Sequence, residues 1–299
     1  MVPPSPARPR RADPVLAWFF VLVWGSGYLA SKIGLQYAAP FTFLALRFLF
    51  GLVCLLPWLL LSRPRWPRGR AEWFHVGVAG LLMHAVNLGG SHHAQYLGLS
   101  AGITALLLAT QPLLTALIAH RFMRQRLGGR QWLGVLAALL GVALVVWHKV
   151  DVQAVPTGAF AAVLVSLAAI TAGTLYQRRY CPQADLRSAS FVQLALSAAA
   201  LTPLAWGLEG FVVRWSWALA GSVLFLVVFA SILAVNALHL LMRRGHATQV
   251  TSLLFLTPIV AVLLEWALFG VVPTPLGALG IAVTCAGVAL VSSNGARPP

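Results

Sequence analysis

The chain matches itself after a shift of 146 residues. Residues 133–134 (LG) fall on residues 279–280 (LG), and residues 141–145 (GVALV) fall on residues 287–291 (GVALV). One constant offset along the whole chain indicates two copies of one structural unit. The same offset pairs further residues: Gly27 with Gly173, Pro57 with Pro203, His93 with His239, and Pro112 with Pro258.

The composition is that of a membrane protein. Hydrophobic residues make up 60% of the chain and charged residues only 9%, whereas soluble domains average about 25% charged residues. Apolar runs of about 20 residues, enough to cross the hydrocarbon core as helices, recur along the chain. We therefore expect an all-α integral membrane protein with ten transmembrane helices, approximately at 15–35, 40–61, 73–95, 100–120, 131–148, 157–178, 188–207, 217–242, 247–269 and 274–293.

The repeat and the spans together predict an inverted architecture. Each copy holds five spans, an odd number, so the second copy must lie upside down relative to the first. We expect a tail at residues 1–13, a first five-helix repeat at 14–149 and a second, inverted repeat at 150–295. Inverted repeats are typical of secondary transporters, whose substrate site lies near the bilayer midplane between the halves.

The positive charges predict the orientation. All but four of the 21 Lys and Arg residues lie on one side of the expected spans, and such residues concentrate on the cytoplasmic side of membrane proteins. Both termini are therefore expected to be cytoplasmic. Because the net charge of +15 is spread between apolar runs, it does not indicate a nucleic-acid partner. The four exceptions are Lys32, Arg47, Lys149 and Arg214.

Polar residues within the spans predict a cavity. Such residues are costly in contact with lipid, so the faces that carry them indicate what the helices surround. Spans 1, 3, 4, 6, 8 and 9 carry polar faces, and spans 5 and 10 do not. For a single Ser or Thr, a hydrogen bond to its own helix is an equally simple explanation. The neutral polar groups suit a zwitterion or a neutral metabolite better than a dication. The cavity candidates are Trp24, Tyr28, His84, Asn87, Ser91, Gln111 and Asn236.

Spans 5 and 10 carry small residues instead. Gly134 and Gly141 recur as Gly280 and Gly287, and small residues let membrane helices approach closely. These spans are expected to be packing elements, and a homodimer through them is possible.

Three charged residues fall inside expected spans and need a reason, since a charge at mid-bilayer costs roughly 2.5–3.5 kcal/mol on insertion scales. Glu265 is the only acid within an expected span. One interpretation is a snorkelling Lys32 and a structural Arg47; the other is a Lys32–Glu265 or Arg47–Glu265 pair at the outer mouth. His92 is expected to face away from His93. Adding the residues that the repeat pairs, the gate candidates are Lys32, His93, Arg178, His239, Glu265 and Arg47.

The order of short motifs resembles a known family. Val23-Trp24-Gly25-Ser26, Lys32, Pro40 and Leu46-Arg47-Phe48 resemble the opening of EamA-type members of the drug/metabolite transporter superfamily, and the segment from Arg130 to Gly141 resembles the end of that domain. The resemblance implies a ten-helix inverted-repeat secondary transporter that moves amino acids or similar metabolites, often outward, by alternating access in a bacterial plasma (inner) membrane.

The resemblance also leaves alternatives. Small multidrug relatives use a carboxylate in helix 1 to bind cations and protons, and helix 1 of this chain has none. Multidrug efflux and uptake of another neutral metabolite remain alternatives to amino-acid export.

Other classes of protein fit the sequence poorly. His84, His92 and His93 are badly spaced for a metal site and no carboxylate joins them. The three cysteines are scattered, without disulfide or metal spacing. A structural subunit would have no reason to bear a polar cavity. We expect no enzyme activity, no metal and no cofactor, and as partners only a small-molecule substrate and the lipid bilayer.

Overall fold

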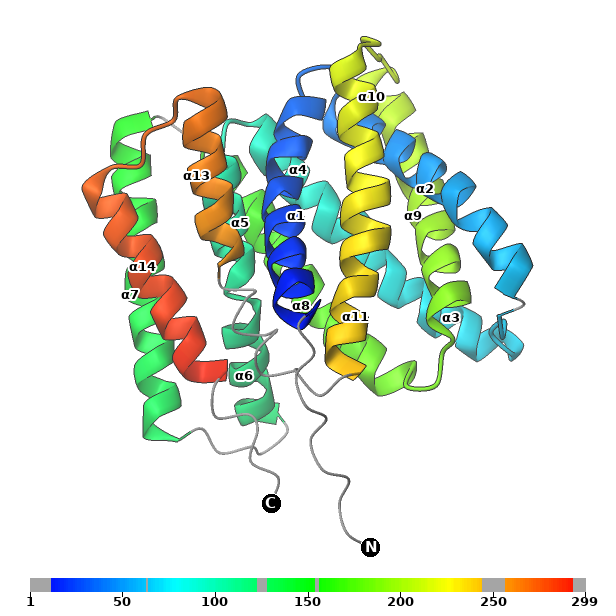
Figure 1. The fold of residues 1–299 in the computed structure, drawn as a ribbon, viewed down its shortest axis with the longest axis horizontal. Helices are drawn as coiled ribbons and strands as arrows, with labels where there is room; N and C mark the ends of the chain where they lie inside the picture. Colours follow the sequence, from blue (N-terminus) through cyan, green and yellow to red (C-terminus); the bar gives the residue numbers. More distant parts are fainter. Residues whose placement is uncertain (1–11, 63, 123–127, 154–155, 244–255, 293–299) are drawn as a thin grey trace, which may run out of the picture.

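The computed structural model describes residues 12–62, 64–122, 128–153, 156–243 and 256–292. Over these residues the fold is helical (Figure 1), and the one extended pairing is an isolated bridge between Ala38 and Val213. The first half of the chain contributes α1 (Ala12–Gly34), α2 (Pro40–Ser62), α3 (Gly69–Gly80), η1 (Leu81–Val86), α4 (Asn87–Tyr96), α5 (Ala101–Ala109), α6 (Gln111–Phe122) and α7 (Gly129–Gln153). The second half contributes α8 (Thr157–Tyr180), α9 (Leu186–Glu209), α10 (Trp217–Leu224), η2 (Phe225–Ala234), α11 (Val235–Arg243), α13 (Thr257–Phe269) and α14 (Pro275–Ser292).

The helices include segments that are able to span a membrane. Six are long and apolar enough by length and composition, and three shorter apolar helices accompany them. An all-helical fold with membrane-spanning helices is thus confirmed, while the ten-span, two-repeat arrangement stays a prediction. The first part of the expected span 247–269 lies outside the described residues. The six are Pro14–Gly34, Pro40–Ser62, Ala101–Ile118, Thr157–Tyr180, Leu186–Glu209 and Trp217–Ala237.

Local sequence signals account for the helix ends. Pro40 begins α2, where its missing N–H costs no helical hydrogen bond. Ser100 and Ser216 precede α5 and α10, and their hydroxyls accept backbone N–H groups of the first turn, which are otherwise unpaired. Gly210 and Gly270 follow α9 and α13 with φ of 66° and 67°, a left-handed conformation that favours glycine.

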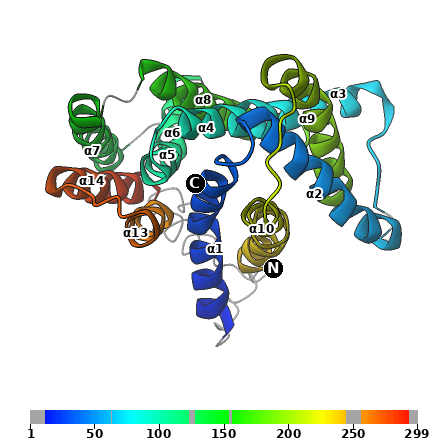
Figure 2. The ribbon, with the colours of Figure 1, turned by 90° about the horizontal axis from the view of Figure 1, so that it is seen from above.

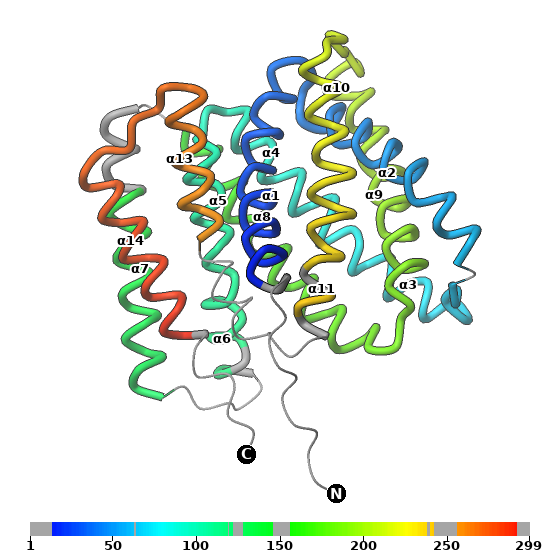
Figure 3. The backbone as a smooth tube through the Cα atoms, viewed as in Figure 1, coloured from blue at the N-terminus to red at the C-terminus, as the bar shows by residue number. Residues whose placement is uncertain are grey.

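The first and last helices of the described chain define two faces. The start of α1 and the end of α14 lie at one end of the molecule, and the turn from α1 to α2 lies at the other (Figures 1 and 3). Following the charge-based prediction, we name the first end the inner face and the second the outer face.

Helices from the two halves pack in pairs. α7 packs against α14, α2 against α9, α4 against α8, and α1 against the α10–η2–α11 run. In Figure 2, α7 and α14 lie apart from α2, α3 and α9, with α1 between the two groups. α2 and α9 begin 146 residues apart, and so do α7 and α14, the same offset that relates the sequence to itself.

Glycines make the contact between α7 and α14 very close. A Cβ added at Gly134 would lie 2.7 Å from the Gly287 carbonyl oxygen, and one at Gly141 would lie 2.5 Å from the Gly280 carbonyl oxygen. Each contact is the other shifted by the repeat offset. The small-residue faces therefore pack on one another within one chain, and a homodimer through these helices stays a prediction that would have to use their other faces.

Two π-helical segments interrupt the helices beside the centre of the molecule. η1 lies between α3 and α4, and η2 lies between α10 and α11. Shifting η1 by the repeat offset places it within η2. π-helical turns are rare and often occur at functional sites, which directs attention to what these two segments border.

Candidate functional site

The central feature is a cavity of about 560 Å³. Its walls come from α1, α2, η1, α4, α5, α6, α8, α9, η2, α11 and α13, and none of the residues that line it belongs to α7 or α14. Figure 2 shows α1, α2, α4, α9 and α10 arranged around this region. Both π-helical segments border it, through Met83 and His84 in η1 and Val227 and Ala230 in η2.

The cavity reaches the protein surface near the inner face. Trp58, in the last turns of α2, and Leu186, at the start of α9, line it and are 45% and 48% exposed. At the other end, Ser31 and Gln95 line it and are buried. The cavity is therefore closed toward the outer face and open toward the inner one.

All seven cavity candidates from the sequence line this one cavity. They come from α1, η1, α4, α6 and α11, which are far apart in the chain. Their role in binding stays a prediction. The residues are Trp24, Tyr28, His84, Asn87, Ser91, Gln111 and Asn236.

Sequence reasoning missed the contribution of α2 and α9. Phe48, Gly51 and Leu55 of α2 and Leu194 of α9 line the cavity. These residues are apolar, so a search for polar faces could not find them. The only signal was Arg47, which we had considered for the outer gate.

Several polar residues of the wall already have partners. Asn87 donates to the Met83 carbonyl, and its own amide oxygen accepts the Ser166 hydroxyl at 2.8 Å, which ties α4 to α8. The Gln111 amide donates to the Thr174 hydroxyl at 3.0 Å. Ser91 donates to its own helix. These contacts build the wall and leave fewer groups free to bind a solute.

His92 faces the cavity, contrary to the expectation that it faces away. It lies eight residues after His84, which puts both on one face of a helix, and it is 3% exposed. His93 instead stacks against Phe41, with ring centroids 6.1 Å apart, and does not line the cavity. Among the described residues, the His92 Nε2 and Gln95 Oε1 atoms are buried without a hydrogen-bond partner.

Of the two ion pairs left open by the sequence, the structure contains Lys32–Glu265. The Lys32 Nζ lies 2.6 Å from a Glu265 carboxylate oxygen. The same carboxylate accepts the backbone N–H groups of Ala101 and Gly102 at 3.1 and 2.9 Å, at the start of α5. The Lys32 ammonium also lies 4.5 Å from the centre of the Phe269 ring. α1, α5 and α13 are thereby joined near the outer face.

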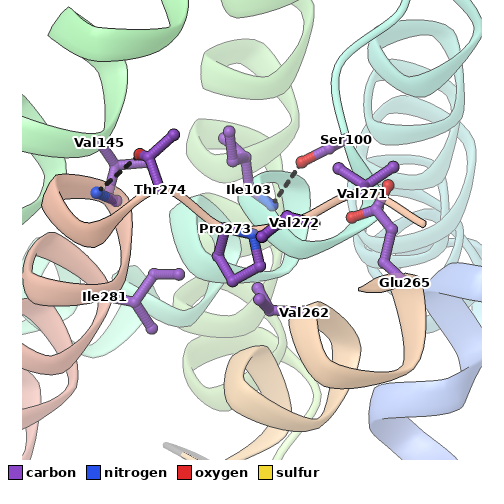
Figure 4. A pocket seen from close by; sticks show the side chains of 11 residues that line it. Ser100, Ile103, Val145, Val262, Glu265, Val271, Val272, Pro273, Thr274 and Ile281 are labelled. Atoms are coloured by element: carbon purple, nitrogen blue, oxygen red, sulfur yellow. Dashed lines mark hydrogen bonds between the residues drawn. The ribbon is translucent and has the colours of Figure 1, made fainter. Parts of the chain in front are cut away.

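The Glu265 carboxylate also borders a small pocket of about 40 Å³ at the outer face. Figure 4 shows the Glu265 carboxylate beside Val271, with Ser100 and Pro273 nearby. This pocket is separate from the central cavity, and no residue is shared between the two.

A second buried carboxylate closes the outer face, and the sequence did not predict it. Glu209 accepts the backbone N–H groups of Phe41 and Thr42 and the Thr42 hydroxyl, so α9 holds the start of α2. We had expected this span to end at residue 207, but α9 continues to Glu209. Glu265 is therefore not the only acid within a span. Nearby, the Arg214 backbone N–H donates to the Tyr37 carbonyl.

The remaining gate candidates lie elsewhere. Arg178 is exposed in the last turn of α8 and does not line the cavity. The side chain of His239 lies outside the described residues. Arg47 lines the cavity, and its Nη2 donates to the Ser231 hydroxyl at 3.3 Å.

Near the inner face, one carboxylate organises the start of α9. Asp185 accepts the backbone N–H and the guanidinium of Arg187 and the backbone N–H of Arg65. These donors, the Arg187 side chain above all, lower the pKa of Asp185 from 3.8 to about 2. The loop after α2 is thereby attached to α9.

No group of three or more His, Cys, Asp or Glu side chains that could hold a metal ion occurs within the described ranges. The histidines around the cavity are spread over η1 and α4 and pack against aromatic rings, His84 against Phe48 and His92 against Phe43.

The chain is similar to known transporters. A model of the EamA-like transporter family matches residues 14–147 and again residues 156–293. The chain is 28% identical over 287 residues to YedA, an uncharacterized inner membrane transporter of Escherichia coli K12, covering 95% of this chain and 92% of YedA. It is 26% identical over 273 residues to YdfC, an uncharacterized transporter of Bacillus subtilis 168, covering 89% and 86%.

Two further likenesses are more distant. A protein of Escherichia coli K12 named probable amino-acid metabolite efflux pump is 25% identical over 173 residues, covering 56% of this chain and 54% of that protein. A solved crystal structure superposes with a TM-score of 0.63 at 18% identity, covering 94% of this chain and 96% of the other. The second likeness concerns the fold alone.

Proposed function

Because the chain belongs to the EamA-like transporter family of the drug/metabolite transporter superfamily, we propose that it is a secondary transporter that exports amino acids or similar small metabolites across the bacterial inner membrane by alternating access. It is a transporter, not an enzyme. The observation that carries the proposal is the central cavity, which is large enough for a small metabolite and is closed at one end.

The proposed architecture has ten spans in two inverted repeats, at residues 14–149 and 150–295, with both termini cytoplasmic. Three features support it. Helix starts recur at the repeat offset, the π-helical segments overlap under it, and the contacts of Gly134 and Gly141 exchange under it. The positive residues support the orientation.

In the proposed cycle the described conformation is the inward-open one. The Lys32–Glu265 pair and the Glu209 contacts hold the outer face closed. Opening outward has to separate α1 from α13, or α2 from α9, and close the inner mouth beside Trp58 and Leu186. Lys32 and Glu265 would then act as the outer gate.

The wall of the cavity suits a solute with an apolar part. Trp24 and Tyr28 lie one turn apart on α1 and offer aromatic surface, and the Trp24 ring packs against Phe20 at 5.3 Å between centroids. We propose Trp24 and Tyr28 as substrate contacts. The name of the distant efflux relative supports amino acids or their derivatives as the substrate class.

The test is a growth-protection screen with a blocked cavity. Cells that overproduce the protein are challenged with toxic amino-acid analogues and related metabolites. The decisive variant is Gly27→Phe, because Gly27 lines the cavity and a Cβ there meets nothing closer than 3.6 Å, so the ring fills the cavity and leaves the backbone in place. The control is Gly221→Phe, since nothing lies within 4 Å of a Cβ at Gly221.

The wild-type protein and Gly221→Phe should protect the cells against at least one compound, and Gly27→Phe should abolish that protection at equal membrane abundance. Equal protection by Gly27→Phe would mean that the cavity is not the transport path.

A further inference from the structure

The central cavity contains a positive charge that the chain does not neutralise. Arg47 lies on α2, about two turns from the outer end of that helix, and lines the cavity. Among the described residues, its itemised hydrogen bond is a long one, to the neutral hydroxyl of Ser231. A guanidinium within a membrane protein is costly unless an anion or a set of dipoles accompanies it.

The chain has only six acidic residues, and they leave Arg47 without a carboxylate. None of the six lines the cavity. Glu265 pairs with Lys32, Asp185 pairs with Arg187, and Glu209 binds the start of α2. The others lie at helix ends away from Arg47: Asp13 in the first turn of α1, Glu72 in the first turn of α3, where it accepts the Arg68 N–H, and Asp151 in the last turn of α7.

The groups around Arg47 belong to one cluster. The charge of Arg47 acts on the rings of both His84 and His92, and all three residues line the cavity. Buried nearby in sequence, the Gln95 amide oxygen and the His92 Nε2 have no partner in the described part of the chain. The outer half of the cavity thus combines one fixed positive charge with polar atoms that await a ligand.

We propose that Arg47 is the anion-binding residue of the cavity and that the transported substrate carries a carboxylate, which provides the missing counter-charge. This inference rests on the proposed function and narrows its substrate class. An amine without a carboxylate is excluded, because the cavity offers it repulsion from Arg47 and no acid.

The rest of the wall determines what accompanies the carboxylate. A guanidinium binds a carboxylate through two parallel N–H donors. The wall beyond Arg47 is mostly aromatic and aliphatic, with Trp24, Phe48 and Leu55 among its members. An apolar body is accommodated there, whereas a small, strongly hydrated anion such as phosphate would leave this surface uncovered.

A cysteine reporter in the cavity tests the inference. Gly51 lies one turn after Arg47 on α2 and lines the cavity, and a Cβ there would meet only Leu194 and Val227, at 3.6 and 4.0 Å. In a background without the three native cysteines, Gly51→Cys is reacted with an anionic and a cationic methanethiosulfonate. Each rate is divided by that of the same reagent with a free thiol. The protein is purified, so the measurement does not depend on transport.

With Arg47 present, the normalised anionic rate should exceed the cationic rate by about tenfold or more, as expected for a unit charge at close range in a partly desolvated site. Arg47→Gln should remove the preference, and Arg47→Lys should keep most of it. Arg214→Gln, which removes an exposed cation outside the cavity, should leave it unchanged. In the Arg47 protein, 3-phenylpropionate should slow the reaction and 2-phenylethylamine should not; in Arg47→Gln the protection should be lost.

Contrary outcomes separate the two proposals. Equal anionic and cationic rates, or protection by the amine alone, would overturn the anion site and leave the transporter proposal intact. A cysteine at position 51 that reacts with neither reagent, in a protein whose exposed Val212→Cys does react, would show that the cavity admits no solute and would overturn both.

Discussion

At the scale of single residues, the contact between Lys32 and Glu265 is not symmetric. The Glu265 side chain is only 3% exposed and is held by two backbone N–H groups as well as by Lys32, whereas the Lys32 side chain is 28% exposed and can extend toward solvent. The carboxylate belongs to the start of α5 in any state in which α5 and α13 stay together, and the lysine is the more easily detached partner.

This asymmetry predicts unequal effects of removing either residue. Glu265→Ala leaves two buried N–H groups and a cation unpaired and should lower the free energy of unfolding by about 3 kcal/mol. Lys32→Met leaves the carboxylate on its N–H donors and should cost about 1 kcal/mol, within the range for partly exposed pairs. Thermal denaturation of the purified protein in detergent measures both. A loss for Lys32→Met as large as that for Glu265→Ala would contradict this account.

At the scale of helices, the close contact of α7 with α14 depends on the absence of side chains. A Cβ at Gly287 would lie 2.5 Å from the Ala138 backbone nitrogen and 2.6 Å from the Gly134 carbonyl oxygen. Neither atom can move without its helix.

Gly287→Ala should therefore force α7 and α14 apart and lower the free energy of unfolding by about 2 kcal/mol, typical of overpacking. Gly221→Ala adds the same methyl group to α10 where nothing lies within 4 Å and should be neutral or slightly stabilising, because alanine favours helices. Denaturation of both variants in the same detergent checks the difference, and similar melting temperatures would disprove it.

The start of α9 should respond to pH. Asp185 has its pKa lowered to about 2, chiefly by the Arg187 side chain, so its stabilising contribution is complete above the ordinary value of 3.8. It should be lost as the pH falls from there toward 2. Asp185→Asn keeps a capping oxygen but cannot ionise, and should flatten the dependence of stability on pH in that window. A pH profile of the melting temperature for both proteins provides the test; parallel profiles would assign the effect to other groups.

Helices also show why the sequence predicted some of the site and not the rest. Polarity identified Trp24 and His84, because a polar group in an apolar helix needs a reason. Phe48 and Gly51 line the same cavity, but an apolar residue in a membrane helix looks alike whether it faces lipid or a cavity. Glu209 was missed because its helix was expected to end two residues earlier, and helix ends cannot be located to a residue from hydrophobicity alone.

At the scale of the whole molecule, the orientation of the protein in the membrane follows from its charges. In a cysteine-free background, Pro67→Cys lies in the loop between α2 and α3 at the predicted inner face, and Val212→Cys, at a position 65% exposed, lies in the turn after α9 at the outer face. A membrane-impermeant reagent added to intact cells should label position 212 and spare position 67 until the cells are permeabilised. The reverse pattern would invert the topology.

The paired glycine contacts between α7 and α14 bear on the history of the gene. If a single unduplicated unit once paired with a second copy of itself, one glycine codon would have supplied both halves of each close contact, so one mutation would have altered the interface twice. In the continuous chain, Gly134 and its counterpart Gly280 are encoded separately and can be selected separately. Duplication thus frees one copy to change while the other preserves the contact, as position 265 illustrates: it is glutamate where the first copy has Ala119. A transporter whose two ends perform different tasks requires that freedom.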